Sequence, residues 1–280
     1  MAAKRRIRAV LFHVFCALFG LVTLYPILWM ISSSFKNTYK VFVDSYNLIP
    51  QPFDFTNYAR GWQGFGGASF STFFSNSAII VCLNVLGALL SSSLIAYGFS
   101  RTNFKGKKFW FFTVIISMML PGQIILVPQY IIFSKLQWVN TFLPLTVPSF
   151  FGSAFFTFLI MQFFRGIPYD LDEAAKLDGC NTFQIYYKIL LPLIKPALIT
   201  AGIFQFYWSW DDFMSPLIYL SKPDLFTASV ALRMFSDPTA QNDWGAMFAM
   251  SVLSLIPPIT VFFIFQKYIV EGISTSGMKA

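Results

Sequence analysis

The sequence predicts an all-α integral membrane protein with six transmembrane helices, and the first reason is composition. Hydrophobic residues make up 56% of the 280 residues, and charged residues only 11%. Because a soluble domain carries about 25% charged residues to cover its surface, this chain requires lipid as its solvent. The same composition excludes a disordered chain. Three widely separated cysteines and a single histidine indicate neither a disulfide scaffold nor a metal or redox site.

The second reason is the length of the apolar runs. A bilayer core about 30 Å thick requires roughly 20 apolar residues of helix. This chain has five runs of at least that length without Asp, Glu, Lys or Arg, and a sixth run that is interrupted only by Asp211 and Asp212. The predicted helices lie at about 9–31, 73–99, 109–133, 142–164, 197–220 and 247–269.

The first run could instead be a signal peptide, because the basic segment Lys4–Arg8 precedes it. Its apolar stretch is longer than the roughly 7–15 residues of a signal-peptide core and no A-x-A site follows, which favours an uncleaved helix. Basic residues also set the orientation, and the Arg101–Lys108 loop marks the cytoplasmic side most firmly. Both termini are then expected in the cytoplasm. The net charge of +8 therefore reflects topology rather than nucleic-acid binding.

The loop between the fourth and fifth predicted helices, residues 165–195, balances acidic and basic residues, which indicates contact with another protein. Pro168 suits the first turn of a short helix, and three acidic residues favour its N-terminal end. Gly179 can end that helix in a left-handed conformation, and Asn181 or Thr182 can cap a second helix. Three residues fall on one face of the first helix at i, i+3, i+4 spacing: Leu171, Ala174 and Ala175.

The most specific motif of the chain lies in this loop. Glu173-Ala174-Ala175, Gly179, Ile189 and Leu191-Pro192 resemble the EAA signature of bacterial ABC importer permeases. In that family the loop is the coupling element that docks into a cleft of the cytoplasmic ATPase. The resemblance implies a type I ABC importer permease fold and a single permease domain over residues 1–280. It also implies ATPase-coupling roles, with both alanines facing the ATPase, for Glu173, Ala174, Ala175, Asp178, Gly179, Ile189 and Pro192.

Further segments are similar to the maltose-type carbohydrate subfamily and to the shorter, six-helix permease of its importers. Trp210–Phe213 with Pro216–Ile218 is similar to a Trp-Asn-Asp/Glu-Phe…Pro-Leu-Ile stretch, although Asp211 replaces the usual Asn. Val230–Phe235 and Asp243–Gly245 are similar to the last external loop, and 270–279 to a tail that reaches into the ATPase dimer. The resemblance implies ATPase contacts by Gly272, Ser276 and Gly277, and contacts with a solute-binding protein by Leu232, Arg233, Met234 and Phe235.

An apolar segment on the external side, such as Val230–Phe235, needs a partner or a membrane surface to cover it. By resemblance, that partner is the solute-binding protein.

The sequence contains no catalytic constellation. It has no Walker A motif, so ATP hydrolysis is expected in a separate subunit that binds ATP and Mg, and no cofactor is expected in this chain. The resemblance implies several partners: a second permease, a cytoplasmic ATPase dimer, an extracytoplasmic solute-binding protein and a carbohydrate substrate. The expected location is the bacterial inner membrane, and the expected function is ATP-driven import of a sugar or oligosaccharide.

A sugar path requires aromatic faces and hydrogen-bonding groups inside the helix bundle. Alternatively, tryptophans near helix ends form the interfacial belt, and small polar residues pack helices together. An ABC permease for a polyamine or phosphate remains an alternative function, and an ATP-independent carrier is disfavoured because no internal repeat is visible. The candidate path residues are Asn84, Gln123, Gln205, Trp208, Asp211 and Asp212.

Overall fold

Helices form nearly all of the regular structure, as the composition predicts. The structure is a computed structural model that describes residues 2–236 and 242–277, with side chains at 5–6, 8–236 and 242–268. Strand pairing among these residues is limited to an isolated bridge between Phe65 and Ala68. The chain divides into two compact units. Unit 1 comprises Met1–Phe70 and Ala231–Ile256, and unit 2 comprises Ser71–Val230 and Pro257–Ala280.

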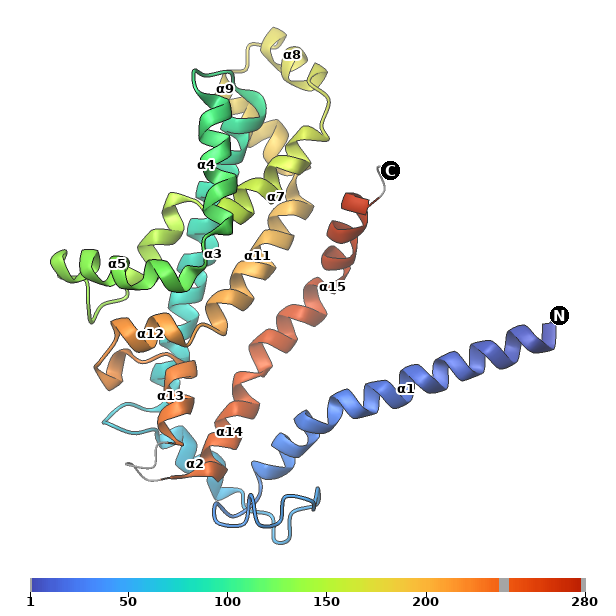
Figure 1. The fold of residues 1–280 in the computed structure, drawn as a ribbon, viewed down its shortest axis with the longest axis vertical. Coiled ribbons are helices and arrows are strands. Elements are labelled where there is room, and N and C mark those ends of the chain that lie inside the picture. The colour runs from blue at the N-terminus through green and yellow to red at the C-terminus, as the bar shows by residue number, and fades with distance from the viewer. Residues whose placement is uncertain (1, 237–241, 278–280) are drawn as a thin grey trace. The chain divides into compact units, whose positions relative to one another are not determined.

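Unit 1 contains the first long helix and the polar segment that follows it. Its helices are α1 (Ala2–Ser33), α2 (Thr56–Gln63) and α14 (Trp244–Ser254), and α14 packs against both others (Figure 1). Near the end of α1, Trp29 meets Phe248 edge to face with 5.2 Å between ring centroids. The most apolar window of Arg8–Ser33 is 0% buried inside the protein. This helix therefore presents its apolar surface outward, as a lipid-solvated helix does.

Unit 2 contains most of the remaining helices. It includes most of α3 (Phe70–Arg101) and α15 (Ile256–Gly277), and α13 (Ala228–Met234) begins in it. Between α3 and α13 lie α4 (Lys107–Met119), α5 (Gly122–Lys135), α6 (Leu143–Thr146), the 3-10 helix η1 (Val147–Phe151), α7 (Ala154–Arg165), α8 (Asp170–Leu177), α9 (Thr182–Gln184), the π-helical η2 (Ile185–Leu190), α10 (Leu191–Leu193), α11 (Lys195–Trp210), α12 (Met214–Tyr219) and the 3-10 helix η3 (Pro223–Leu225).

The core of unit 2 is built where α3, α7 and α11 meet the 165–195 loop. Phe156, Ile160 and Phe164 on α7 are fully buried, and Leu190 of η2 joins them from the loop. In Figure 1, α8 and α9 lie at the end of unit 2 where α3 ends and α4 begins. The loop is thus an integral part of the folded unit rather than a loose connection.

Four described helical stretches are long and apolar enough to cross a membrane, or up to 6 if each of two sharply bent helix pairs counts as one span. Three of the predicted helices, 9–31, 73–99 and 142–164, correspond to Arg8–Ser33, Phe70–Arg101 and Leu143–Arg165. The fourth stretch, Trp244–Tyr268, corresponds to the predicted 247–269. The predicted membrane fold is confirmed, but the two remaining predicted helices are broken.

The predicted helix 109–133 is divided into α4 and α5, which meet at 103°. Pro121 stands at the break in an extended conformation, with ψ of 130°, and its ring leaves no N–H for the helix ladder. Leu120 is extended too, because a residue before proline is disfavoured in helical geometry. The predicted span is therefore present but bent.

The predicted helix 197–220 is also discontinuous, since α11 ends at Trp210 and α12 begins at Met214. Asp212 accepts a hydrogen bond from the backbone N–H of Ser215 at 3.1 Å, which satisfies a free donor in the first turn of α12. A carboxylate that bonds the backbone in this way competes with continued helix. Before α11, the bend toward Thr182–Leu193 is 77°.

Candidate functional site

The break at Pro121 and the break between α11 and α12 lie at one cavity of about 1020 Å³. Its wall comes from the end of α4, the start of α5, the start of α7 and the end of α11. Irregular backbone at membrane depth is tolerated where it lines a cavity, because its free polar groups then meet water or a ligand. The lining residues are Ser117, Met118, Leu120, Gly122, Gln123, Ser153, Ala154, Phe155, Tyr207, Trp208, Asp211 and Asp212.

Four of the six predicted path residues line this cavity: Gln123, Trp208, Asp211 and Asp212. The other two, Asn84 and Gln205, do not. Their side chains converge on the hydroxyl of Ser209, at 3.1 Å from Asn84 Nδ2 and 2.9 Å from Gln205 Nε2. Both amides therefore join α3 to α11 or brace α11 itself, as polar residues between membrane helices do. Their assignment to the path stays a prediction.

Trp208 is held in place by neighbouring rings yet stays half exposed. Its ring centroid lies 5.2 Å from that of Phe155 and 5.1 Å from that of Phe156, both at the start of α7. The side chain nevertheless remains 50% exposed. An aromatic ring fixed by its neighbours loses little conformational entropy when a ligand stacks on it. Trp208 is therefore suited to contact the C–H face of a sugar ring.

The two carboxylates differ in how firmly the backbone holds them. Asp212 is fixed by the bond from Ser215, and its carbonyl oxygen accepts a second hydrogen bond from Ser229 Oγ at 2.8 Å. Asp211 is exposed, at the C-terminal end of α11. Placed at a cavity, both can accept hydrogen bonds from hydroxyl groups.

The 165–195 loop has the local structure that the sequence predicts. Gly179 adopts φ +82°, the left-handed conformation that ends α8, and Asn181 caps the following helix. Asn181 Oδ1 accepts from Gln184 N–H at 2.9 Å, and Gln184 Oε1 accepts from Asn181 N–H at 2.8 Å. This reciprocal capping box satisfies two free donors and fixes the start of the second helix.

A buried ion pair anchors α8, and sequence analysis missed it. Arg101 Nη1 at the end of α3 lies 3.3 Å from Asp172 Oδ2, with side chains 2% and 9% exposed. Arg101 Nη2 also donates to the carbonyl oxygens of Phe164 at 3.0 Å and Ile167 at 2.7 Å. Tyr169 covers the guanidinium at 4.3 Å from its ring centroid. The sequence does show that Asp172 lies three residues before Ala175 and therefore shares a helix face with it.

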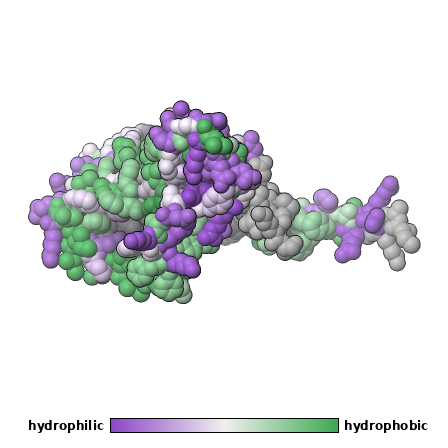
Figure 2. Space-filling view, turned by 90° about the horizontal axis from the view of Figure 1, so that it is seen from above, coloured by the Kyte–Doolittle hydropathy of each residue, from purple (hydrophilic) through white to green (hydrophobic). Residues whose placement is uncertain are grey.

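The surface of α8 differs from the expected one. Ala175 is 4% exposed and belongs to the core of unit 2, whereas Ala174 and Glu173 are exposed. The expectation that both alanines face outward is therefore wrong, because α8 turns the face with Asp172 and Ala175 inward. Leu177 is 89% exposed instead. Figure 2 looks onto the end of unit 2 that carries α8 and shows hydrophilic residues beside hydrophobic ones.

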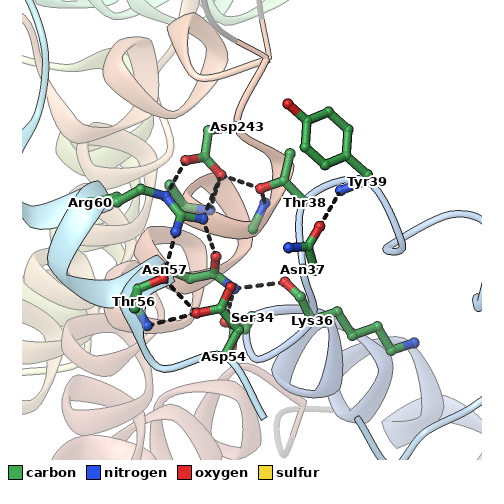
Figure 3. A network of polar contacts seen from close by, with 12 residues as sticks. Ser34, Lys36, Asn37, Thr38, Tyr39, Asp54, Thr56, Asn57, Arg60 and Asp243 are labelled. Carbon is green, nitrogen blue, oxygen red and sulfur yellow. Dashed lines mark hydrogen bonds and ion pairs between the residues drawn. The ribbon is translucent and has the colours of Figure 1, made fainter. Parts of the chain in front are cut away.

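Unit 1 contains a polar cluster outside the long helices (Figure 3). Arg60 of α2 donates from Nε to Asp243 Oδ2 at 2.7 Å, and Asp243 also accepts from Thr38 and from Ala246 N–H. Asn57 donates to the carbonyl oxygens of Ser34 and Lys36, each at 2.8 Å. Three separate chain segments are thereby tied together.

Asp243 caps α14 and stays ionised more readily than a free aspartate. Burial alone would raise its pKa, but the hydrogen bonds from Arg60, Thr38 and Ala246 N–H and the charge of Arg60 hold the pKa below its usual value. A capping carboxylate at a helix N-terminus is favourable in its charged form. Asp243 thus links α14 to α2 and to the segment that follows α1.

Residues 84–275 match the family described as "Binding-protein-dependent transport system inner membrane component". The chain belongs to this family. The permease is 36% identical over 267 residues to the probable ABC transporter permease protein YurM of Bacillus subtilis, a match that covers 95% of this chain and 87% of that one. It is 32% identical over 265 residues, 94% of each chain, to the arabinooligosaccharides transport system permease protein AraQ of Halalkalibacterium halodurans.

A solved structure has the same fold. The crystal structure of a bacterial ABC transporter involved in the import of the acidic polysaccharide alginate matches with a TM-score of 0.82 and 24% identity, covering 94% of the permease and 96% of that chain. Membership of the transport family makes the permease a multi-pass inner-membrane subunit of a transporter and not an enzyme. The prediction of an ABC importer permease is confirmed.

Phe235, which directly follows α13, is covered by aromatic rings of the permease itself. Phe235 is 7% exposed, and its ring packs against those of Phe65 and Phe70 at 5.4 and 6.5 Å. Of the four residues predicted to contact the binding protein, Leu232 and Met234 are half-buried and Arg233 is exposed. Phe235 is therefore covered within the chain, and the predicted contact of Leu232, Arg233, Met234 and Phe235 with a solute-binding protein stays a prediction.

The predicted ATPase-contacting tail lies at the end of the described chain. Gly272, Ser276 and Gly277 lie on the last part of α15, where the structure describes the backbone alone. Residues 278–280, at the end of the predicted tail, lie outside the described residues. The role of this tail stays a prediction.

Proposed function

We propose that the permease forms half of a pore that imports a sugar or oligosaccharide, driven by a separate ATPase. One observation carries the proposal: the cavity at the helix breaks combines the half-exposed Trp208 with the hydrogen-bonding groups of Gln123, Asp211 and Asp212. Aromatic faces stack on sugar C–H surfaces, while amides and carboxylates bind hydroxyl groups. The relatives named for arabinooligosaccharides and alginate support a carbohydrate.

The 165–195 loop is the proposed contact with the ATPase. Its exposed surface offers Glu173 and Ala174 on α8, with Leu177, Phe183 and Tyr187 as uncovered hydrophobic side chains. Uncovered hydrophobic side chains rimmed by charges indicate a protein interface. ATP and Mg are proposed to bind in the ATPase, and a second permease and an extracytoplasmic solute-binding protein complete the transporter.

The orientation follows from the same placement. The loop lies at the end of unit 2 that also carries the basic Arg101–Lys108 segment. Basic segments remain in the cytoplasm, so we place α8, α9 and both termini on that side. The polar cluster of Arg60 and Asp243 then belongs to the external side, where the binding protein delivers its cargo.

The test is transport by the complete complex in proteoliposomes. Uptake of arabinose oligosaccharides is expected only with ATP and the binding protein. Trp208→Ala should reduce uptake by up to about tenfold, since a stacked ring contributes about 0.5–1.5 kcal/mol, while leaving the subunits assembled. Trp110→Ala is the matched control, because Trp110 is 55% exposed and lies outside the cavity lining. Uptake without ATP would favour a secondary carrier, and normal uptake by Trp208→Ala would contradict the proposed path.

A further inference from the structure

The cavity at the helix breaks is charged with one sign. Its described lining carries two carboxylates, Asp211 and Asp212, and includes no lysine, arginine or histidine. Neither carboxylate is in an ion pair: the ion pairs found among the described residues are Arg60–Asp243 and Arg101–Asp172. Within the part of the chain whose side chains are described, no neighbouring cation therefore neutralises the charge of the two aspartates.

The position of the carboxylates makes their charge act on anything that enters. Asp211 is exposed at the end of α11. The Asp212 carboxylate accepts a hydrogen bond from Ser215 N–H, and the Asp212 backbone carbonyl accepts one from Ser229 Oγ. Trp208 and Gln123 share the cavity, so a cargo stacked on the ring comes close to both carboxylates. At short range and in partly dry surroundings, like charges repel far more strongly than in bulk water.

We infer that Asp211 and Asp212 select against anionic cargo, so that the permease carries an uncharged carbohydrate. An uncharged sugar presents hydroxyl donors that the two carboxylates accept, whereas a uronic acid or phosphorylated sugar brings a like charge to the same place. This inference rests on the proposed function, because it names the class of carbohydrate that the proposed path accepts.

Labelling of a cysteine in the cavity measures the charge directly and requires no transport. Ser153 lines the cavity at the start of α7, and the Ser153→Cys change can be made in a complex whose Cys16, Cys82 and Cys180 have been changed to Ala. The probes are two thiosulfonates, one with a trimethylammonium group and one with a sulfonate. Relative to a free thiol, the introduced cysteine should react faster with the cationic reagent than with the anionic one.

The variants decide whether the aspartates are the cause. In Asp211→Asn/Asp212→Asn the preference for the cationic reagent should fall by about tenfold. Asp224→Asn is the matched control, because Asp224 is an exposed carboxylate of unit 2 that does not line the cavity, and it should leave the preference unchanged. An unchanged preference in the double variant would overturn the inference, as would equal labelling by both reagents before the change.

Protection of the same cysteine tests the cargo class. An uncharged arabinose trisaccharide at millimolar concentration should slow labelling, whereas its counterpart ending in a uronic acid should not. The double variant should lose this discrimination. Equal protection by both sugars in the parent complex would overturn the inference. If neither sugar protects while the cationic reagent keeps its advantage, the proposed carbohydrate path is wrong and the charge selectivity stands.

Discussion

At the scale of single residues, the buried pair of Arg101 and Asp172 links the transmembrane helix α3 to the proposed ATPase contact. A buried ion pair is seldom a large net source of stability, because both charges lose their hydration. Removing one partner is different, since it leaves the other charge buried and unpaired. Arg101 also bonds two carbonyl oxygens near the end of α7, so the pair fixes three segments at one point.

Asp172→Asn should therefore weaken the attachment of α8. The expected cost is about 3–5 kcal/mol of local stability, because the guanidinium of Arg101 stays buried without its counter-charge. The measurement is hydrogen exchange of residues 165–195 in the purified complex, together with ATPase co-purification. Asp170→Asn is the control, since Asp170 is exposed two residues away on the same helix. Exchange equal in the two variants would contradict an anchoring role for the pair.

The lowered pKa of Asp243 predicts that the polar cluster on the proposed external side loses stability in acid. Its pKa is lowered in the folded state, so ionised Asp243 contributes stability above the unfolded pKa of about 3.9, and this contribution is lost as pH falls through the folded pKa. Proteolysis of the Thr38–Arg60 segment should stay slow from about pH 7 to 4 and accelerate below that range. Asp243→Asn should be cleaved faster at neutral pH. If proteolysis of Asp243→Asn still accelerated to the full extent in acid, another group would have to cause the pH dependence.

At the scale of elements, breaks rather than whole helices position the functional groups. Pro121 interrupts one span, and Asp211–Phe213 interrupts another. Both interruptions fall at the same cavity, so the irregular backbone and the polar side chains occupy one place in unit 2. The 165–195 loop is similarly built from short helices, with Gly179 as its turn.

Gly179→Val should uncouple the ATPase from transport while leaving insertion unaffected. A left-handed conformation costs a residue with a Cβ roughly 1–2 kcal/mol, and a β-branched residue resists it most. Apart from Gly179 and its two chain neighbours, no heavy atom of the described residues lies within 4 Å of the position that a Cβ would take, so the effect is one of backbone conformation. Gly179→Asn is the matched control, because asparagine tolerates this conformation. Comparable transport by the Val and Asn variants would contradict the role of the turn.

At the scale of the whole molecule, topology decides whether the proposed ATPase contact and the binding-protein side lie on opposite faces of the membrane. The apolar window of Arg8–Ser33, 0% buried, and a loop end rich in basic residues together predict an orientation with both termini in the cytoplasm. In the proposed function, an extracytoplasmic binding protein delivers the cargo on the side opposite the ATPase. The proposed orientation can therefore be tested by asking which residues a reagent reaches from outside the cell.

Cysteine labelling in intact cells checks this orientation. In a cysteine-free chain, Asn103→Cys should react with a membrane-impermeant maleimide only after the cells are opened, and Ser221→Cys should react at once. Both residues are exposed and uncharged, so neither change alters the charge bias that sets topology. Reaction of Asn103→Cys in intact cells would reverse the orientation.

The membrane class, the approximate spans, the turn at Gly179 and a helix cap at Asn181 or Thr182 follow from the sequence alone. These features depend on local quantities: the length of apolar runs, and the conformational preferences of residues near in sequence. Four of the six predicted path residues line the cavity, and the polar ones stand out in the sequence because polar groups within an apolar run are uncommon. Their role in a sugar path stays a prediction.

Which of these residues meet depends on the packing of the folded chain. Asp172 and Ala175 turn inward because Arg101 and the core of unit 2 receive that face of α8, while Ala174 stays outside. Asn84 and Gln205 bond Ser209 instead of lining the cavity, and Phe235 packs on rings of its own chain. Hydropathy shows that a residue is apolar or polar, but burial and pairing depend on contacts between segments far apart in the chain.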